Sequence, residues 1–275
     1  MKKTICEVCP RRCELGEGQR GACGARGNKG GAVVSLNYGR LTSLALDPVE
    51  KKPLARWESG KYILSAGSFG CNLFCPFCQN YQISRADERT QTENCPPKRL
   101  TELAQGLKSR GNVGIAFTYN EPLIGFEYVR DCAVLAKEAG LKIVLVTNGC
   151  MNAALFAELL PLVDALNIDL KSFAADFYRN IGGDLDTVKE NIAAAAKMCH
   201  VEVTTLVIPG QNDSAELMEQ EAAWLFDIDP RIPLHLSRFF PRYKMANATP
   251  TPIETIKKLQ KIAVAHLQYV YLGNC

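Results

Sequence analysis

Three cysteines stand close together in the sequence, at Cys71, Cys75 and Cys78. This C-x3-C-x2-C spacing lets one loop present three thiolates to the corners of a [4Fe–4S] cluster, which leaves one iron free to bind another molecule. Two alternatives stay open. Cys95 could complete a tetrahedral zinc site with the same thiolates, or the cysteines could be small buried apolar side chains.

A second group of four cysteines lies within 18 residues near the start of the sequence. Its members are Cys6, Cys9, Cys13 and Cys23. Residues 1–35 are rich in glycine and charge and lack apolar periodicity, so a bound metal would supply the stabilisation that a small core cannot. Zinc is the favoured metal, a second, fully ligated [4Fe–4S] cluster is the alternative, and a cap without metal stays open.

Elements that could position these residues begin near residue 61, where short apolar runs alternate with amphipathic helical patterns. The runs cover residues 62–64, 113–117, 143–146, 165–168, 203–207 and 234–236. Strands separated by helices form parallel sheets with right-handed crossovers. Polar residues follow every run, as at the mouth of a barrel, where the carboxyl ends of strands meet. The sequence therefore predicts an α/β fold, a partial (βα)6 TIM-like barrel.

The predicted division of the chain has two parts. Residues 1–58 form a small irregular cysteine-rich cap that binds metal, together with a connecting strap at residues 36–58, and residues 59–275 form the barrel. We find no internal repeat and no low-complexity tract.

The amino-acid composition limits the class of protein, its partners and its location. Hydrophobic residues make 47% of the 275-residue chain and charged residues 22%, as in ordinary globular proteins. The net charge of +3 is too small to indicate a nucleic acid or an acidic membrane as partner. No long apolar run predicts a membrane span, and no targeting signal is apparent, so we expect a reducing, cytoplasmic location where cysteines bind metals.

The cysteine motif, with Phe77 directly before its last cysteine, resembles the signature of radical SAM enzymes. The resemblance implies that Cys71, Cys75 and Cys78 ligate the catalytic [4Fe–4S] cluster, whose open iron chelates S-adenosylmethionine (SAM). One electron from the reduced cluster then splits SAM into methionine and a 5′-deoxyadenosyl radical, which abstracts hydrogen from a substrate. Phe77 would lie against the adenine, with ordinary loop packing as the alternative.

Residues after the second run depart from the family's usual Gly-Gly-Glu. The chain has Tyr119, Asn120 and Glu121 there. Asn120 and Glu121 can still accept hydrogen bonds from the SAM amino group. The alternative is a helix N-cap at Asn120, and both roles are compatible.

Later segments resemble the pyruvate formate-lyase activating branch of this family. Thr147 and Asn148 belong to its Thr-Asn-Gly segment, and Asp169 and Lys171 to its Asp-x-Lys segment. All four are expected at the cofactor, with Lys171 facing the SAM carboxylate as a point charge, unless it forms only a rim salt bridge. Arg238 could contact SAM or an anionic substrate, or be a solvated rim arginine.

The resemblance extends over nearly the whole chain to the AmmeMemoRadiSam-system radical SAM proteins. It is carried by Cys9-Pro10-x2-Cys13, Gly21-x-Cys23-Gly24-x-Arg26, the segment 117–122 and Arg238-Phe239-Phe240-Pro241. We therefore expect a radical SAM enzyme that acts on a small molecule, a peptide or a protein, with reduced ferredoxin or flavodoxin as electron donor. A glycyl-radical enzyme activase is one alternative, and a non-enzymatic iron–sulfur electron carrier is another.

Overall fold

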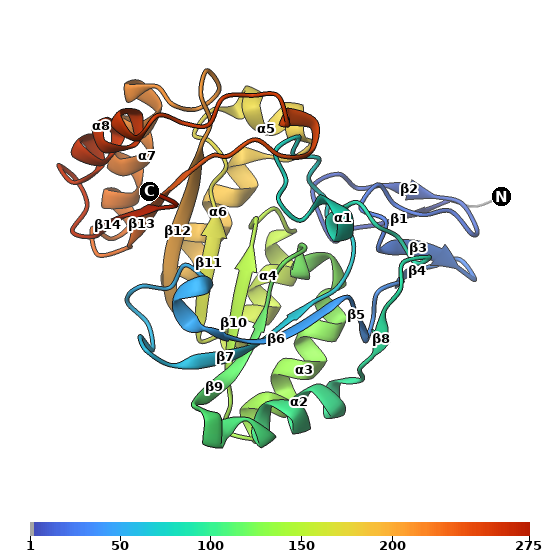
Figure 1. Ribbon diagram of the computed structural model, residues 1–275. Coiled ribbons are helices and arrows are strands. Elements are labelled where there is room, and N and C mark those ends of the chain that lie inside the picture. The colour runs from blue at the N-terminus through green and yellow to red at the C-terminus, as the bar shows by residue number, and fades with distance from the viewer. Residues whose placement is uncertain (1–2) are drawn as a thin grey trace.

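The computed structural model describes residues 3–275 and builds them around one eight-stranded sheet (Figure 1). From one edge to the other, its strands are β14 (Val270–Gly273), β13 (Leu234–Arg238), β12 (His200–Val207), β11 (Ala165–Asp169), β10 (Lys142–Thr147), β9 (Asn112–Phe117), β7 (Tyr62–Gly67) and β6 (Ser43–Pro48). Neighbouring strands are parallel except for the antiparallel pair β6 and β7. The sheet order ends at β14 and β6, so the barrel is partial.

The predicted partial barrel is confirmed, and each of the six predicted runs lies in a strand of this sheet. The structure adds a seventh parallel strand, β14. Its four residues are all half-buried, so they lack the buried apolar run that marks the other strands.

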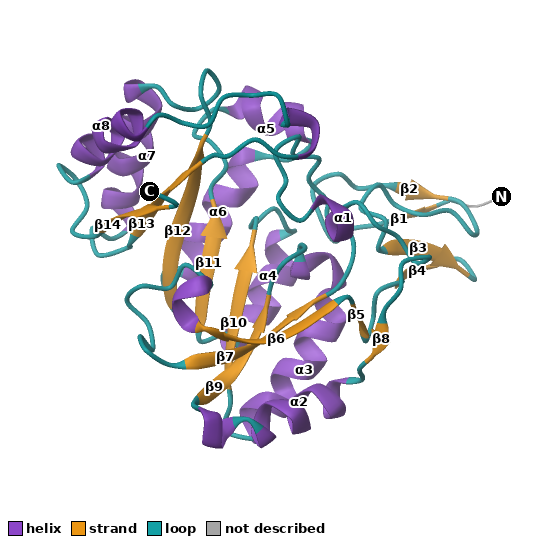
Figure 2. Cartoon of the chain, in the orientation of Figure 1, coloured by secondary structure: helices purple, strands orange, loops and turns teal. Residues whose placement is uncertain are grey.

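Helices flank the sheet (Figure 2). The helices are α1 (Tyr81–Ser84), α2 (Pro97–Gly106), α3 (Phe126–Glu138), α4 (Ala153–Leu159), α5 (Ala175–Ile181), α6 (Leu185–Ala195), α7 (Ala215–Ile228) and α8 (Ile253–Ala263). Short 3-10 helices are η1 (Val49–Lys51), η2 (Lys108–Arg110), η3 (Pro122–Gly125), η4 (Leu160–Leu162) and η5 (Tyr243–Met245). Phe126, Val129, Ala133 and Ala136 repeat at helical spacing in α3 and are all buried. No helix among residues 3–275 has the length and apolar character needed to cross a membrane.

The N-terminal cap forms short antiparallel strand pairs beside the mouth of the barrel (Figure 1). Its pairs are β1 (Thr4–Ile5) with β2 (Glu14–Leu15) and β3 (Arg26–Lys29) with β4 (Ala32–Ser35), and a further pair joins β5 (Arg40–Leu41) to β8 (Glu93–Asn94). Polar contacts tie the cap to the barrel. The Asn152 N–H donates to the Val8 carbonyl at 3.0 Å, and the guanidinium of Arg11 to the Gly182 carbonyl at 2.8 Å.

The strap at residues 36–58 contributes β6 and η1, so part of it belongs to the barrel sheet. Its end is held by Glu202 of β12, which is fully buried. The Glu202 carboxylate accepts the N–H groups of Ala55 at 2.9 Å and Arg56 at 2.7 Å. Burial would raise the pKa of Glu202, but hydrogen bonds from His200, His235 and these two N–H groups lower it to about 2. The division at residue 58 stays a prediction.

Candidate active site

A cavity of about 660 Å³ opens at the carboxyl ends of the strands. Ten of the eleven residues predicted around the central motif line it, namely Cys71, Cys75, Phe77, Cys78, Asn120, Glu121, Thr147, Asn148, Asp169 and Lys171. They come from the loop after β7 and from the ends of β9, β10 and β11, as expected for parallel strands that end at one mouth.

The loop that carries the three cysteines is fixed by backbone hydrogen bonds. The Gly70 N–H donates to the Ile83 carbonyl at 2.9 Å, and the Cys71 N–H donates to the Cys23 carbonyl at 3.2 Å. Gly70 has a φ of +89°, and a Cβ there would lie 2.5 Å from the Cys23 oxygen. Only glycine therefore fits at residue 70 without moving the cap.

The three thiols suit a cluster better than a single ion. Burial raises the pKa of Cys75 to about 11, and burial likewise raises that of Cys71. Such thiols lose their protons when their sulfur atoms bind iron. Among residues 3–275, no three His, Cys, Asp or Glu side chains are arranged to hold one metal ion. A [4Fe–4S] cluster spreads its ligands over separate irons and fits this donor set.

The structure gives no support to the zinc alternative with Cys95. Cys95 does not line the cavity and is buried near Tyr128, whose hydroxyl donates to the Cys95 carbonyl at 2.7 Å. A zinc ion at the cysteine loop would therefore lack its predicted fourth ligand.

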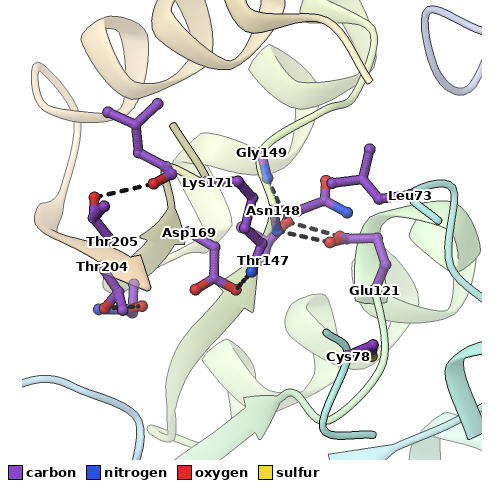
Figure 3. A network of polar contacts seen from close by, with 12 residues as sticks. Leu73, Cys78, Glu121, Thr147, Asn148, Gly149, Asp169, Lys171, Thr204 and Thr205 are labelled. Atoms are coloured by element: carbon purple, nitrogen blue, oxygen red, sulfur yellow. Dashed lines mark hydrogen bonds and ion pairs between the residues drawn. The ribbon is translucent and has the colours of Figure 1, made fainter. Parts of the chain in front are cut away.

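Glu121 is the centre of a buried network (Figure 3). Its Oε1 accepts from the Thr147 hydroxyl at 2.7 Å and from the Leu123 N–H at 2.9 Å, and its Oε2 accepts from the Asn148 N–H at 2.7 Å. Burial raises the pKa of Glu121 to about 7, although these hydrogen bonds oppose the shift. Glu121, rather than Asn120, is the N-cap of η3.

The side chain of Asn120 forms hydrogen bonds with the backbone of the cysteine loop. Its Oδ1 accepts the Ser68 N–H at 2.9 Å, and its Nδ2 donates to the carbonyls of Phe69 and Gly70 at 3.2 and 3.1 Å. Its predicted contact with the cofactor stays a prediction, whereas its role in holding the loop is visible here.

The side chain of Asn148 lies next to the first cysteine of the motif. Its Nδ2 donates to Asn72 Oδ1 at 2.9 Å and lies 3.7 Å from the sulfur of Cys71. Its Oδ1 accepts the Cys150 N–H at 2.9 Å. These contacts orient the wall of the cavity around the thiol.

Asp169 and Lys171 form an ion pair at the mouth, with 2.8 Å between Asp169 Oδ2 and Lys171 Nζ (Figure 3). Burial disfavours the charged form of Lys171, but the Asp169 carboxylate outweighs it and the pKa is raised. The Lys171 backbone is also held, because its N–H donates to the Tyr178 hydroxyl at 2.9 Å and its carbonyl accepts from Asn212 at 2.8 Å. An ammonium group is thus fixed inside the cavity.

Arg238 is the predicted residue that the structure places outside the cavity lining. Its Nε donates to the Thr251 carbonyl at 2.6 Å, and its guanidinium stacks on Phe240. Adjacent strand residues face opposite sides, so Ser237 lines the cavity and Arg238 turns away. The arrangement gives no support to the predicted contact between Arg238 and SAM.

Phe77 is 4% exposed and lines the cavity, with its ring centroid 6.1 Å from that of Phe177. The ring is therefore packed and available to a ligand on one side. Its contact with adenine stays a prediction.

The sequence analysis missed a second network at the cavity wall. Tyr119 donates its hydroxyl to Asp47 Oδ2 at 2.6 Å, and Lys52 donates to the same oxygen at 2.7 Å. Tyr119 has a φ of +74°. This tyrosine stands where the family usually has glycine, and that exchange was the available signal.

A histidine of β13 that the sequence analysis did not single out also lines the cavity. His235 Nε2 lies 2.5 Å from Glu202 Oε2, and its ring stacks on Tyr271, with ring centroids 5.2 Å apart. A glutamate inside the apolar run Val201-Glu202-Val203 was the sequence signal for this buried pair.

The four N-terminal thiols lie near one another. Repulsion from Cys23, Cys6 and Cys13 adds to burial, the largest cause, in raising the pKa of Cys9 to about 11. No three of them are arranged to hold one metal ion within the described chain, so the zinc ion or second cluster at these cysteines stays a prediction.

Comparison with known proteins agrees with this site. The pattern of the Radical SAM superfamily matches residues 67–220, more than half of the chain. An uncharacterized protein of Methanocaldococcus jannaschii is 39% identical over 278 residues, covering 99% of this chain and 81% of that protein. A pyruvate formate-lyase-activating enzyme of Clostridium pasteurianum is 28% identical over 153 residues, covering 52% of this chain and 63% of that enzyme.

Further relatives share the barrel. A 4-hydroxyphenylacetate decarboxylase activating enzyme of Clostridioides difficile (strain CD196) is 25% identical over 152 residues, which cover 52% of this chain and 48% of that enzyme. The matches thus span 63% and 48% of the lengths of these two activating enzymes. The crystal structure of Streptococcus suis SuiB bound to S-adenosylmethionine has a TM-score of 0.60 at 13% identity, over 76% of this chain and 49% of that chain. At that identity the likeness shows the fold.

The superfamily pattern covers the cysteine loop, the Glu121 network and the Asp169–Lys171 pair, all of which border one cavity. Membership favours an enzyme over the non-enzymatic electron carrier. This chain belongs to the radical SAM superfamily, which implies a [4Fe–4S] cluster and SAM as its cofactors.

Proposed function

We propose that this protein cleaves SAM reductively and uses the product to abstract hydrogen from a substrate, which is a small molecule, a peptide or a protein. When bound and reduced, the cluster supplies one electron to SAM, which gives methionine and a 5′-deoxyadenosyl radical. The observation that carries the proposal is the shared cavity of about 660 Å³, lined by three thiols, a buried carboxylate and a fixed ammonium group.

Each wall of the cavity has a proposed task. Cys71, Cys75 and Cys78 hold the cluster, and Phe77 packs against the adenine. Glu121 accepts from the SAM amino group through a carboxylate that Thr147, Leu123 and Asn148 already orient. These hydrogen bonds hold the acceptor in place before SAM binds.

The other side of the cavity supplies the positive charge. Lys171 binds the SAM carboxylate as a point charge, and Asp169 keeps the ammonium group in position across 2.8 Å. The burial of the pair strengthens its attraction relative to a solvated ion pair.

Radical SAM cleavage consumes one electron per SAM, so a reduced donor is needed. We propose reduced ferredoxin or flavodoxin as this donor.

The second candidate function is that of an activase, whose substrate is a protein. Its support is the similarity to pyruvate formate-lyase and 4-hydroxyphenylacetate decarboxylase activating enzymes. In this case the hydrogen would come from a backbone glycine, leaving a glycyl radical on the partner. Electron paramagnetic resonance (EPR) of candidate partners after turnover tests it, and an absence of a stable backbone radical would contradict it.

The first experiment is anaerobic reconstitution with iron and sulfide, reduction with dithionite, addition of SAM and quantification of 5′-deoxyadenosine. We expect product from the unaltered chain and none from Cys78→Ala. Cys199→Ala is the matched control, since Cys199 is a half-buried thiol that does not line the cavity, and it should keep the activity. An intact cluster that forms no 5′-deoxyadenosine would overturn the proposal.

A further inference from the structure

A row of four side chains crosses the inner face of the sheet. Each member is the register partner of the next on the neighbouring strands β11 to β14, and all four line the cavity. They are Asp169, Thr204, His235 and Tyr271. Neighbouring strands lie about 4.8 Å apart, so the row extends over about 14 Å, with His235 about 10 Å from Asp169. The row therefore begins at the proposed SAM site and continues into a part of the cavity that holds no assigned ligand.

Glu202 fixes the imidazole of His235 within this row. It lies two residues before Thr204 on β12, so both side chains point to the same face of the sheet. Glu202 Oε2 lies 2.5 Å from His235 Nε2. Although burial opposes it, hydrogen bonds lower the pKa of Glu202 to about 2, so the carboxylate is ionised. An ionised carboxylate only accepts hydrogen bonds, and Nε2 of His235 is therefore the donor.

The other ring nitrogen of His235 is left as an acceptor. A neutral imidazole has one proton, and the hydrogen bond made by one nitrogen decides which of the two carries it. Within residues 3–275 no hydrogen bond reaches Nδ1, and the atom is not enclosed. The side chain of His235 is 12% exposed and lines the cavity. The lone pair of Nδ1 is therefore open to a ligand there.

The other two histidines of the chain lack this combination. His200 Nε2 lies 2.9 Å from Glu202 Oε1, and His266 Nε2 lies 2.7 Å from Glu219 Oε1. Neither of them lines the cavity. Of the three histidines, His235 alone joins a fixed proton position to access to the cavity, which makes it a group that can bind a substrate.

The strap adds a wall to this part of the cavity. Pro53 and Ala55 line it, and Glu202 Oε2, the oxygen next to His235, accepts the Ala55 N–H at 2.9 Å. The Pro53 carbonyl accepts from Asn167 Nδ2 at 2.8 Å. One carboxylate thus holds both the histidine and the strap. A cavity of about 660 Å³ has the size of a small-molecule site, and SAM would fill part of it.

We propose that His235 is a substrate-binding residue, whose Nδ1 accepts a hydrogen bond from a hydroxyl or amino group of a small molecule bound between the row and the strap. Glu202 is its positioning residue, because it fixes the proton on Nε2. The contact orients the substrate, so the position of the carbon that loses hydrogen depends on it. This inference rests on the proposed function, since the substrate is the molecule that gives hydrogen to the 5′-deoxyadenosyl radical.

The proton position is tested without turnover. The chain has three histidines, so labelling them with nitrogen-15 gives a simple long-range proton–nitrogen correlation spectrum of the oxidised, cluster-loaded protein. His235→Gln assigns the signals of His235. At about pH 8 we expect a neutral ring with its proton on Nε2. A proton on Nδ1 would overturn the inference. Glu202→Gln, whose amide can also donate, should give both tautomers, and an unchanged spectrum would contradict the role of Glu202.

The substrate contact is tested with a protein-free extract of perdeuterated cells that carry this protein. The extract is dissolved in ordinary water, so only carbon-bound deuterium remains, and mass spectrometry measures its transfer to 5′-deoxyadenosine. We expect labelled product from the unaltered chain. In His235→Phe the labelled fraction should fall at least about tenfold, because a hydrogen bond is lost. His235→Gln, whose amide oxygen can accept, should restore part of it, and the control His266→Phe should leave it unchanged.

The inference and the proposed function fail separately. An unaltered chain that forms no 5′-deoxyadenosine would contradict the proposed function, while the spectrum still decides the proton position of His235. Product that forms but stays unlabelled would overturn the small-molecule class and leave SAM cleavage standing. Equal labelled fractions in the unaltered chain and His235→Phe would overturn the role of His235. If His235→Phe does not assemble its cluster, His235→Leu replaces it with the same expectation.

Discussion

The hydroxyl of Tyr119 donates to Oδ2 of Asp47 across 2.6 Å and so fixes a residue whose φ is +74°. A left-handed conformation costs a residue with a side chain about 1–2 kcal/mol. Lys52 donates to the same carboxylate oxygen at 2.7 Å. Burial would raise the pKa of Asp47, but these two hydrogen bonds outweigh it and lower the pKa to about 2. The left-handed conformation of Tyr119 at the cavity wall is therefore stabilised by the Asp47 carboxylate and not by the residue's own backbone preference.

Tyr119→Phe removes this hydroxyl and leaves the ring. We expect the free energy of unfolding to fall by about 1.5 kcal/mol, because a hydrogen bond to a charged group is lost. Urea unfolding of the anaerobic, cluster-loaded protein measures the change. Tyr62→Phe is the control, since Tyr62 is 43% exposed, and it should change stability little. Equal losses in the two variants would contradict the role of the Asp47 contact.

SAM binding should depend on the ionisation of Glu121. Burial raises the pKa of this carboxyl to about 7 from an ordinary value of 4.5, so it is protonated below about pH 7 and ionised above it. An ionised carboxylate accepts from an amino group more strongly than a protonated one. SAM affinity, measured by equilibrium binding to the reconstituted protein, should rise from pH 6 to pH 8.

Glu121→Gln provides the control for this pH dependence, because an amide does not titrate. SAM itself titrates equally in both experiments, so the difference between the two profiles isolates Glu121. Parallel profiles would show that Glu121 does not face the ligand. The stability of the fold depends on pH in the opposite direction to SAM binding. Because the pKa of Glu121 is raised in the folded state, this group stabilises the fold fully below about pH 4.5, and its contribution is lost as the pH rises through about 7.

Lys171→Met should weaken SAM binding by about 10- to 100-fold, because a charge-assisted hydrogen bond contributes about 1.5–3 kcal/mol. Arg238→Met removes the same charge from a residue outside the cavity lining and should change the affinity less than about twofold. Equilibrium binding of SAM measures both. A larger effect of Arg238→Met than of Lys171→Met would contradict the assigned geometry.

Gly70→Ala tests the close contact between cap and barrel. The new Cβ would lie 2.5 Å from the Cys23 oxygen, so the cap must shift, and we expect unfolding to become easier by about 3 kcal/mol. Gly210→Ala is a matched control, because Gly210 has a φ of +70° but has nothing within 4 Å of its Cβ position. It should cost only the backbone strain of about 1 kcal/mol. Similar losses of stability in the two variants would show that backbone strain, and not the contact with Cys23, causes the destabilisation.

The parallel barrel could be predicted because its buried strands are continuous apolar runs with polar residues at their ends. Cys71, Glu121 and Lys171 could be placed at one mouth for the same reason. β14 has four half-buried residues and no such run, so only the paired neighbour β13 reveals it. β6 was hidden in the strap, because an edge strand on one side of the sheet needs little apolar sequence.

Side-chain direction was the harder part. Arg238 follows a run like the other mouth residues, but it is one position beyond Ser237 and therefore faces away from the cavity. Asn120 and Glu121 were expected to face the ligand, and the structure shows that nearby backbone groups also compete for their oxygens. Such competition depends on loops that pack only in the folded chain.

Glu202 also sets an order of assembly. Its carboxylate holds the N–H groups of Ala55 and Arg56, which precede it in the chain by 147 and 146 positions. Contacts between residues so far apart form late, because the long intervening loop must first be closed. The strap lines the cavity through Glu50, Lys51, Pro53 and Ala55. Cys71, Cys75 and Cys78 are therefore synthesised long before Glu202 can fix this wall of their cavity, which leaves their thiols open to iron and sulfide during the interval.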